Sequence, residues 1–155
     1  MHNILIIDDE EDILDVLSDV ITSWGYLPII ARDGEDALEK FKEVPVDLVL
    51  SDIRMPKIDG LSLLERIKKA SPNTIVILLT GHPSIESAVR AMKDGAFDYL
   101  TKPINLDELK VKIDRGLERM KLNKSLSFLK GINWSLLISI PIWLILGIIL
   151  AHLLR

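Results

Sequence analysis

A chain of 155 residues without cysteine has room for one globular domain and an appendage, and it excludes disulfides and thiolate metal sites. The net charge of −4 is uneven, because residues 1–109 carry 11 Lys/Arg against 21 Asp/Glu (−10) and residues 110–130 carry 7 against 2 (+5). The acidic part disfavours binding to nucleic acid, whereas the basic part, which precedes an apolar stretch, favours a membrane surface.

Short apolar runs alternate five times with segments of helical periodicity. The runs are rich in Ile, Val and Leu, so they predict strands buried on both faces, as in a parallel sheet covered by helices. The alternation therefore predicts a doubly wound α/β domain. The expected strands are Asn3–Ile7, Leu27–Ala31, Asp47–Ser51, Thr74–Leu79 and Phe97–Thr101. The expected helices are Ile13–Trp24, Gly34–Lys42, Leu61–Lys69, Ser84–Lys93 and Leu106–Met120.

Polar residues stand where four of these strands end, at the edge of the sheet where such folds carry their sites. They are Asp8 and Asp9, Asp52, Thr80 and Lys102. Each alone has an ordinary explanation, since the acids and the threonine could cap helices and the lysine could be a solvated charge. Together, three carboxylates within a few ångströms require a cation, and oxygen ligands favour Mg²⁺.

A carboxylate surrounded by a metal, a lysine and a hydroxyl is the arrangement that phosphoryl transfer to that carboxylate requires. Asp52 would be the nucleophile, giving an acyl phosphate. Mg²⁺ and Lys102 would hold the phosphoryl oxygens, and Thr80 would donate a hydrogen bond. A dehalogenase-type phosphatase is disfavoured because Arg54 stands where it needs a second acid, and a flavodoxin because acids follow the first strand.

Four sequence segments resemble the receiver domains of two-component response regulators, especially those of the NtrC-like group. They are "ILIIDDEEDI", "VDLVLSDIRMPKIDG", "VILLTGH" and "AFDYLTKPI". The resemblance covers residues 1–120 and implies a flavodoxin-like fold, with a five-stranded parallel sheet in the order 2-1-3-4-5 and five helices. It also implies a role for each matched residue. Asp52 would be the phosphoacceptor; Asp8, Asp9, Asp52 and the Arg54 carbonyl would bind Mg²⁺; Thr80, Tyr99 and Lys102 would bind phosphate and switch; and a cis peptide bond would precede Pro103.

The same resemblance implies partners and an output surface. A sensor histidine kinase or a phosphotransfer protein would supply the phosphoryl group, and an unidentified protein would receive the signal. The surface formed by residues 84–94, the fifth strand and the helix from Leu106 would carry that signal. A homodimer would form through this surface or through the expected transmembrane helix. The chain would be a signalling phosphoacceptor rather than an enzyme.

The end of the chain is apolar, with no charged residue from Gly131 to Leu154. As a helix, residues 132–154 would span about 35 Å, enough to cross a hydrocarbon core of about 30 Å. We therefore expect a transmembrane helix at 132–154 after a basic linker at 121–131. The lysines and arginines before the span predict a single-pass protein of the cell inner membrane with the receiver in the cytoplasm. A buried helical hairpin and a dimerising helix are the competing interpretations.

The expected function is that of a membrane-anchored receiver in a phosphorelay. Two alternatives stay open. One is a membrane-tethered adaptor with a receiver-like fold that works without phosphorylation, and the other is a fragment of a longer membrane sensor.

Overall fold

The computed structural model describes the backbone of residues 1–153. It describes the side chains of residues 1–123 and of residues 125, 126, 145, 149, 150 and 152. The chain divides into two compact units, Met1–Met120 and Lys121–Arg155.

The first unit is built on one parallel sheet. Among the described residues its strands run in the order β2-β1-β3-β4-β5. The predicted flavodoxin-like α/β fold, with five parallel strands and five helices, is confirmed. The strands are β1 (Asn3–Ile7), β2 (Leu27–Ala31), β3 (Leu48–Asp52), β4 (Ile75–Thr80) and β5 (Asp98–Thr101).

Each strand is followed by a helix, and side-chain caps begin three of them. Asp33 accepts hydrogen bonds from the first backbone N–H groups of α2, and Asp59 and Ser84 do the same for α3 and α4. Such caps satisfy donors that the helix cannot pair internally. The helices are α1 (Glu11–Ser23), α2 (Gly34–Glu43), α3 (Gly60–Ala70), α4 (Ile85–Lys93) and α5 (Leu106–Leu153).

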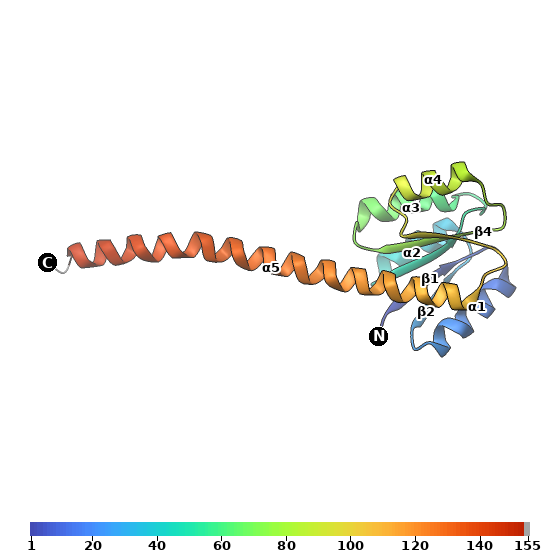
Figure 1. Ribbon diagram of the computed structural model, residues 1–155, viewed down its shortest axis with the longest axis horizontal. Coiled ribbons are helices and arrows are strands. Elements are labelled where there is room, and N and C mark those ends of the chain that lie inside the picture. The colour runs from blue at the N-terminus through green and yellow to red at the C-terminus, as the bar shows by residue number, and fades with distance from the viewer. Residues whose placement is uncertain (154–155) are drawn as a thin grey trace. The chain divides into compact units, whose positions relative to one another are not determined.

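The sheet separates two apolar cores, because successive strand residues point to opposite faces. In β1, Ile4 and Ile6 pack with α1 and the beginning of α5, whereas Leu5 and Ile7 pack with α2, α3 and α4. All four side chains are fully buried. Figure 1 shows the sheet between these two helical layers.

Helix α5 continues from the first unit into the second. It begins at Leu106 and ends at Leu153, and the second unit consists of its later part. The sequence analysis expected a helix to Met120 and a linker at 121–131, whereas the backbone is helical from Leu106 to Leu153.

The predicted transmembrane helix is not supported. No helix in the described part of the chain is long and apolar enough to cross a membrane. The described side chains of α5 are charged at short intervals as far as Lys121, and most side chains of residues 132–154 lie outside the described residues. The single-pass location in the cell inner membrane depended on that span, so that prediction was wrong.

Candidate functional site

The carboxyl ends of four strands meet at one edge of the sheet. In the strand register, Ile7 pairs with Ser51, Asp52 with Leu79, and Thr80 with Thr101. Asp8 and Lys102 directly follow β1 and β5, while Asp52 and Thr80 are the last residues of β3 and β4. The topology therefore brings four of the predicted residues to the same edge.

A lysine links two buried carboxylates at this edge. Lys102 Nζ donates a hydrogen bond to Asp8 Oδ2 at 2.8 Å and lies 3.1 Å from Asp52 Oδ1. Asp8 is fully buried and Asp52 is 5% exposed. Glu10 Oε1 lies farther from the same ammonium group, at 3.6 Å, and its side chain is largely exposed. Two buried carboxylates thus share one cation.

Burial dominates the electrostatics of Asp52. It raises the pKa of the Asp52 carboxyl, and the hydrogen bond and charge of Lys102 offset only part of that effect, while Asp8 adds to it. Burial alone would lower the pKa of Lys102, but Asp8 and Asp52 outweigh it and raise that pKa. The lysine therefore stays charged, and the carboxylates retain an excess of negative charge that a further cation would neutralise.

The segment after β3 folds tightly against Asp52. The Arg54 N–H donates to Asp52 Oδ2 at 2.8 Å, and the Gly60 N–H donates to the Ile53 carbonyl at 2.9 Å. A Cβ atom on Gly60 would lie 2.3 Å from the Asp52 carbonyl oxygen, so only glycine fits there. The beginning of α3 consequently fixes the backbone of the predicted phosphoacceptor.

The structure does not bring Asp9 into this cluster. Its side chain is exposed at the rim, whereas Asp8 Oδ1 accepts a hydrogen bond from the Glu10 N–H at 3.0 Å. Among the described residues, no group of three or more acidic or histidine side chains is close enough together to hold a metal ion. The expected triple cluster is therefore a buried pair, Asp8 and Asp52, bridged by Lys102.

The donor set nevertheless suits a hard divalent ion. Asp8 and Asp52 supply buried carboxylate oxygens whose charge Lys102 balances only in part. The backbone carbonyl of Arg54 and the rim carboxylate of Asp9 are further oxygen donors of the kind that Mg²⁺ takes, together with water. No thiolate or imidazole belongs to the group, which disfavours zinc.

The remaining predicted residues lie on β4, on β5 and just after β5. Thr80 is almost fully buried, and its hydroxyl oxygen accepts a hydrogen bond from the His82 N–H at 3.1 Å, which leaves the hydroxyl proton able to donate elsewhere. Tyr99 is half-buried on β5, and its hydroxyl lies 2.9 Å from Ser87 Oγ on α4. The peptide bond between Lys102 and Pro103 is cis.

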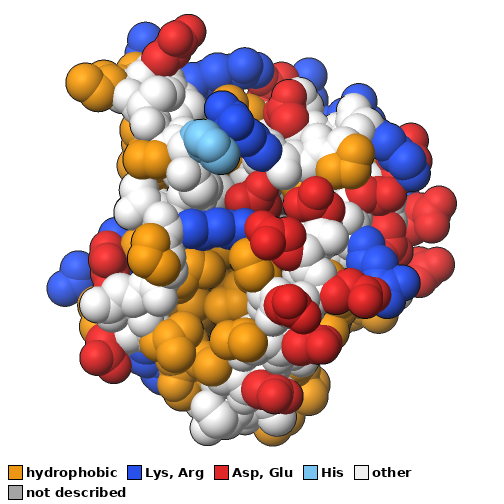
Figure 2. Space-filling view, turned by 90° about the vertical axis from the view of Figure 1, so that its right-hand side faces the viewer, with side chains coloured by type: hydrophobic (Ala, Val, Ile, Leu, Met, Phe, Trp, Pro, Cys, Tyr) orange, Lys and Arg blue, Asp and Glu red, His pale blue; other side chains and the backbone are white. Residues whose placement is uncertain are grey.

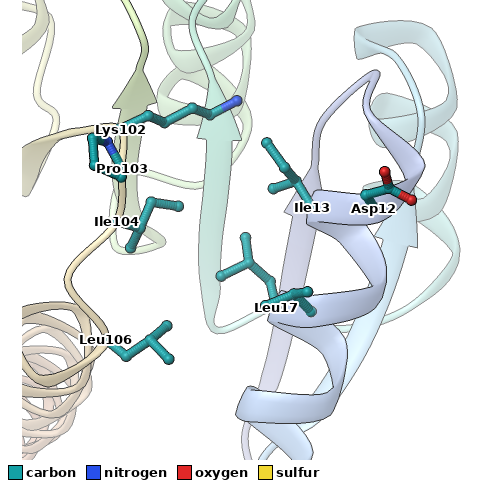
Figure 3. Close-up of a pocket in the computed structure, with 8 residues that line it drawn as sticks. Asp12, Ile13, Leu17, Lys102, Pro103, Ile104 and Leu106 are labelled. Atoms are coloured by element: carbon teal, nitrogen blue, oxygen red, sulfur yellow. The ribbon is translucent and has the colours of Figure 1, made fainter.

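An apolar groove beside Lys102 was missed from the sequence. It measures about 390 Å³ and lies between α1 and the segment that joins β5 to α5 (Figure 3). On the face that Figure 2 shows, an apolar depression lies beside a gathering of acidic side chains. One residue in the sequence could have indicated this groove: Val16 is apolar but lies outside the apolar face of α1, and its side chain is exposed. The groove is lined by Asp12, Ile13, Val16, Leu17, Lys102, Pro103, Ile104 and Leu106.

Comparison with known families decides the kind of protein. Residues 4–114 match the model of the response regulator receiver domain. The chain belongs to this family. Receiver domains are signalling phosphoacceptors of two-component systems rather than enzymes in the usual sense, and they interact with sensor kinases or other phosphodonors.

Relatives place this receiver near the NtrC-like regulators. The chain is 39% identical to the transcriptional regulatory protein ZraR of Klebsiella oxytoca, over 79% of this chain and 28% of that protein. It is also 39% identical to the nitrogen assimilation regulatory protein NtrX of Azorhizobium caulinodans, over 85% of this chain and 30% of that protein. The chain thus spans less than a third of the length of these relatives, and their names give the predicted membrane anchor no support.

Solved structures show the same fold. A response regulator receiver domain protein from Clostridium thermocellum superposes with a TM-score of 0.76 at 38% identity, covering 79% of this chain and 98% of that one. The beryllofluoride-activated NtrC4 receiver domain dimer gives 0.74 at 36% identity, covering 77% and 99%.

Proposed function

We propose that the chain accepts a phosphoryl group on Asp52 in a two-component phosphorelay. The observation that carries this proposal is the contact of Lys102 with Asp52, a buried carboxylate whose pKa is raised at the carboxyl edge of a receiver sheet. We place the receiver at residues 1–120 and a linker at 121–131.

Each residue around Asp52 would have its own role in phosphoryl transfer. An oxygen of Asp52 attacks the phosphorus atom, the bond from phosphorus to the leaving atom of the donor breaks, and an acyl phosphate forms. The Lys102 ammonium stabilises the transferred oxygens, and the Thr80 hydroxyl donates a hydrogen bond to one of them. Asp8, Asp9, Asp52 and the Arg54 carbonyl would hold Mg²⁺, which supplies charge neutralisation during transfer.

The donor would be a sensor histidine kinase or a phosphotransfer protein, and a second protein would receive the signal. A phosphoryl group on Asp52 would draw Thr80 toward its oxygens and allow Tyr99 to turn toward the space that Thr80 leaves. The surface of α4, β5 and the beginning of α5 would then present a changed face to a partner protein or to a second receiver.

The test is phosphorylation by a small donor. The purified chain is incubated with Mg²⁺ and acetyl phosphate, and its intact mass is followed over time. We expect one phosphoryl group on the parent and on Asp59→Asn, an acid at the start of α3, and none on Asp52→Asn. A parent that gains no mass would favour an adaptor that works without phosphorylation. An Asp52→Asn variant that gains as much mass as the parent would place the phosphoacceptor at another residue.

A further inference from the structure

The predicted switch tyrosine is tied to the first turn of a helix. Tyr99 Oη lies 2.9 Å from Ser87 Oγ, in a partly buried contact between β5 and α4. Ser87 Oγ also lies 2.7 Å from Ser84 Oγ and 3.0 Å from the Ser84 carbonyl oxygen. Ser84 is the N-cap of α4, and its hydroxyl oxygen accepts from the Ser87 N–H at 3.1 Å. Tyr99 therefore joins the capping network of α4.

Counting protons assigns each bond a direction. A serine hydroxyl has one proton to donate and two lone pairs to accept with. The carbonyl of Ser84 can only accept, so it takes the Ser87 proton. Ser87 Oγ then accepts from the hydroxyls of both Ser84 and Tyr99. This assignment uses all three hydroxyl protons and fills both lone pairs of Ser87 Oγ, so Ser87 Oγ has no lone pair left for a further donor.

Helix α4 buries few of its side chains, and Arg90 joins its later part to Glu65 on α3 at 3.2 Å. Of its nine residues, only Ala91 is buried, while Ile85, Val89 and Met92 are 86%, 46% and 52% exposed. A helix with so few buried apolar contacts has low local stability, and single hydrogen bonds then matter to its position. The bond from Tyr99 to Ser87 is thus a sizeable part of what fixes the first turn of α4.

We propose that Ser87 is a positioning residue that latches Tyr99 to α4 in the unphosphorylated chain. Turning Tyr99 toward Thr80 breaks the latch, removes one partner from the α4 cap and frees the first turn to move. The latch opposes activation by the strength of one neutral hydrogen bond. This inference rests on the proposed function, because it concerns the change that phosphorylation of Asp52 triggers.

The test adds beryllofluoride stepwise to the full chain in the presence of Mg²⁺. The NMR amide resonances of α4 are followed, and they give the apparent affinity for beryllofluoride. Ser87→Ala and Tyr99→Phe should each raise the apparent affinity roughly two- to tenfold, the effect of one neutral hydrogen bond. The double variant should match the single ones, because all three lack the same bond. Ser87→Thr keeps a hydroxyl and should restore the parent affinity. Tyr26→Phe removes a tyrosine hydroxyl that bonds Asp114 instead, and should change nothing.

Two results would overturn the latch in a parent that responds. One is an unchanged affinity in Ser87→Ala, and the other is a double variant whose effect is the product of the single ones. A parent that does not respond contradicts the proposed function instead, and the latch is then judged in the resting chain. In the chain without beryllofluoride, three-bond NMR couplings should show a single side-chain rotamer of Tyr99 in the parent. In Ser87→Ala they should show an average over several rotamers. A single rotamer in both would end the proposal.

Discussion

The ammonium group of Lys102 lies 3.1 Å from the carboxylate of Asp52, and both side chains are largely buried. The same group donates to Asp8, so one positive charge holds two carboxylates together at the end of the sheet. Removing it would leave the two carboxylates facing each other in a site with little water.

Lys102→Met should therefore destabilise the metal-free chain. Breaking a buried ion pair on one side costs about 3 kcal/mol in the free energy of unfolding, because an uncompensated charge stays buried. Added Mg²⁺ should recover part of that loss by neutralising Asp8 and Asp52, and a chelator should remove the recovery. Urea unfolding at pH 7, with Mg²⁺ and with chelator, measures both effects.

Lys110→Met is the matched control. Lys110 pairs with Asp114 in a part-exposed contact on α5, where an ion pair is worth at most about 1 kcal/mol. Its loss should be small and insensitive to Mg²⁺. Equal losses in the two variants would show that the Lys102 site is no more buried than an ordinary surface pair.

Asp52→Asn should stabilise the metal-free chain near neutral pH. Burial raises the pKa of Asp52, so the folded state holds its proton more tightly than the unfolded state. The contribution of this tighter proton binding to the free energy of unfolding is fully present below the unfolded pKa of about 4. It is lost as the pH rises through the pKa of the folded state. The variant has no such loss. Its advantage in melting temperature should be largest at pH 7 and should shrink as the pH falls toward about 4.

Asp33→Asn should behave in the opposite sense. A hydrogen bond from the Asp36 backbone, followed by the Lys57 ammonium, lowers the pKa of Asp33. Its stabilisation is present above the unfolded pKa and fades as pH falls through the folded one. The variant should thus be less stable than the parent at pH 7 and approach it in acid. Matching pH profiles for the two variants would contradict the burial assigned to Asp52.

Gly60→Ala should damage both the fold and the site. Its Cβ atom would lie 2.3 Å from the Asp52 carbonyl oxygen, so the start of α3 or the phosphoacceptor must shift. Overpacking of this kind costs about 3 kcal/mol of unfolding free energy. Gly25→Ala, at φ +84° with nothing within 4 Å of the new atom, should cost only about 1 kcal/mol of backbone strain. Denaturant unfolding measures the loss of unfolding free energy in both variants. Equal losses would contradict the close approach of Gly60 to the Asp52 carbonyl.

The phenol of Tyr26 should lose its proton only at unusually high pH. Burial, followed by the hydrogen bond that Tyr26 donates to Asp114 at 2.6 Å, raises the pKa of Tyr26 to about 12. In Tyr99→Phe it is the only tyrosine left, so its tyrosinate absorbance can be followed alone. Asp114→Asn should move the midpoint toward the ordinary value of about 10. A midpoint near 10 in Tyr99→Phe itself would contradict the burial of Tyr26 and its hydrogen bond to Asp114 on α5.

The strand pattern predicted the fold because strands buried on both faces are apolar throughout, a signal that survives without tertiary information. The position of the site followed for a related reason, since parallel strands end at one edge. The sharing of Lys102 between two acids could not be predicted, because it depends on how side chains fill that edge. Asp8 and Asp9 were expected to act together, but the chain bends at Asp9 just after β1, and Asp8 is buried while Asp9 is exposed.

The apolar end of the chain shows where sequence patterns mislead. The run without charges from Gly131 to Leu154 met the length criterion for a membrane span, but the described part of the chain contains no helix long and apolar enough to cross a membrane. The groove beside Lys102 was missed for the complementary reason. Its walls come from α1 and from the segment after β5, about ninety residues apart, and only the fold brings them together.

The position of the phosphoryl group tests the central claim most directly. After reaction with Mg²⁺ and acetyl phosphate, borohydride reduces an acyl phosphate to a primary alcohol, so a phosphorylated aspartate becomes homoserine, which peptide mass spectrometry can locate. We predict homoserine at position 52 in the parent chain and aspartate at positions 8, 9 and 59. Homoserine at any of those three acids, with Asp52 unchanged, would contradict the account.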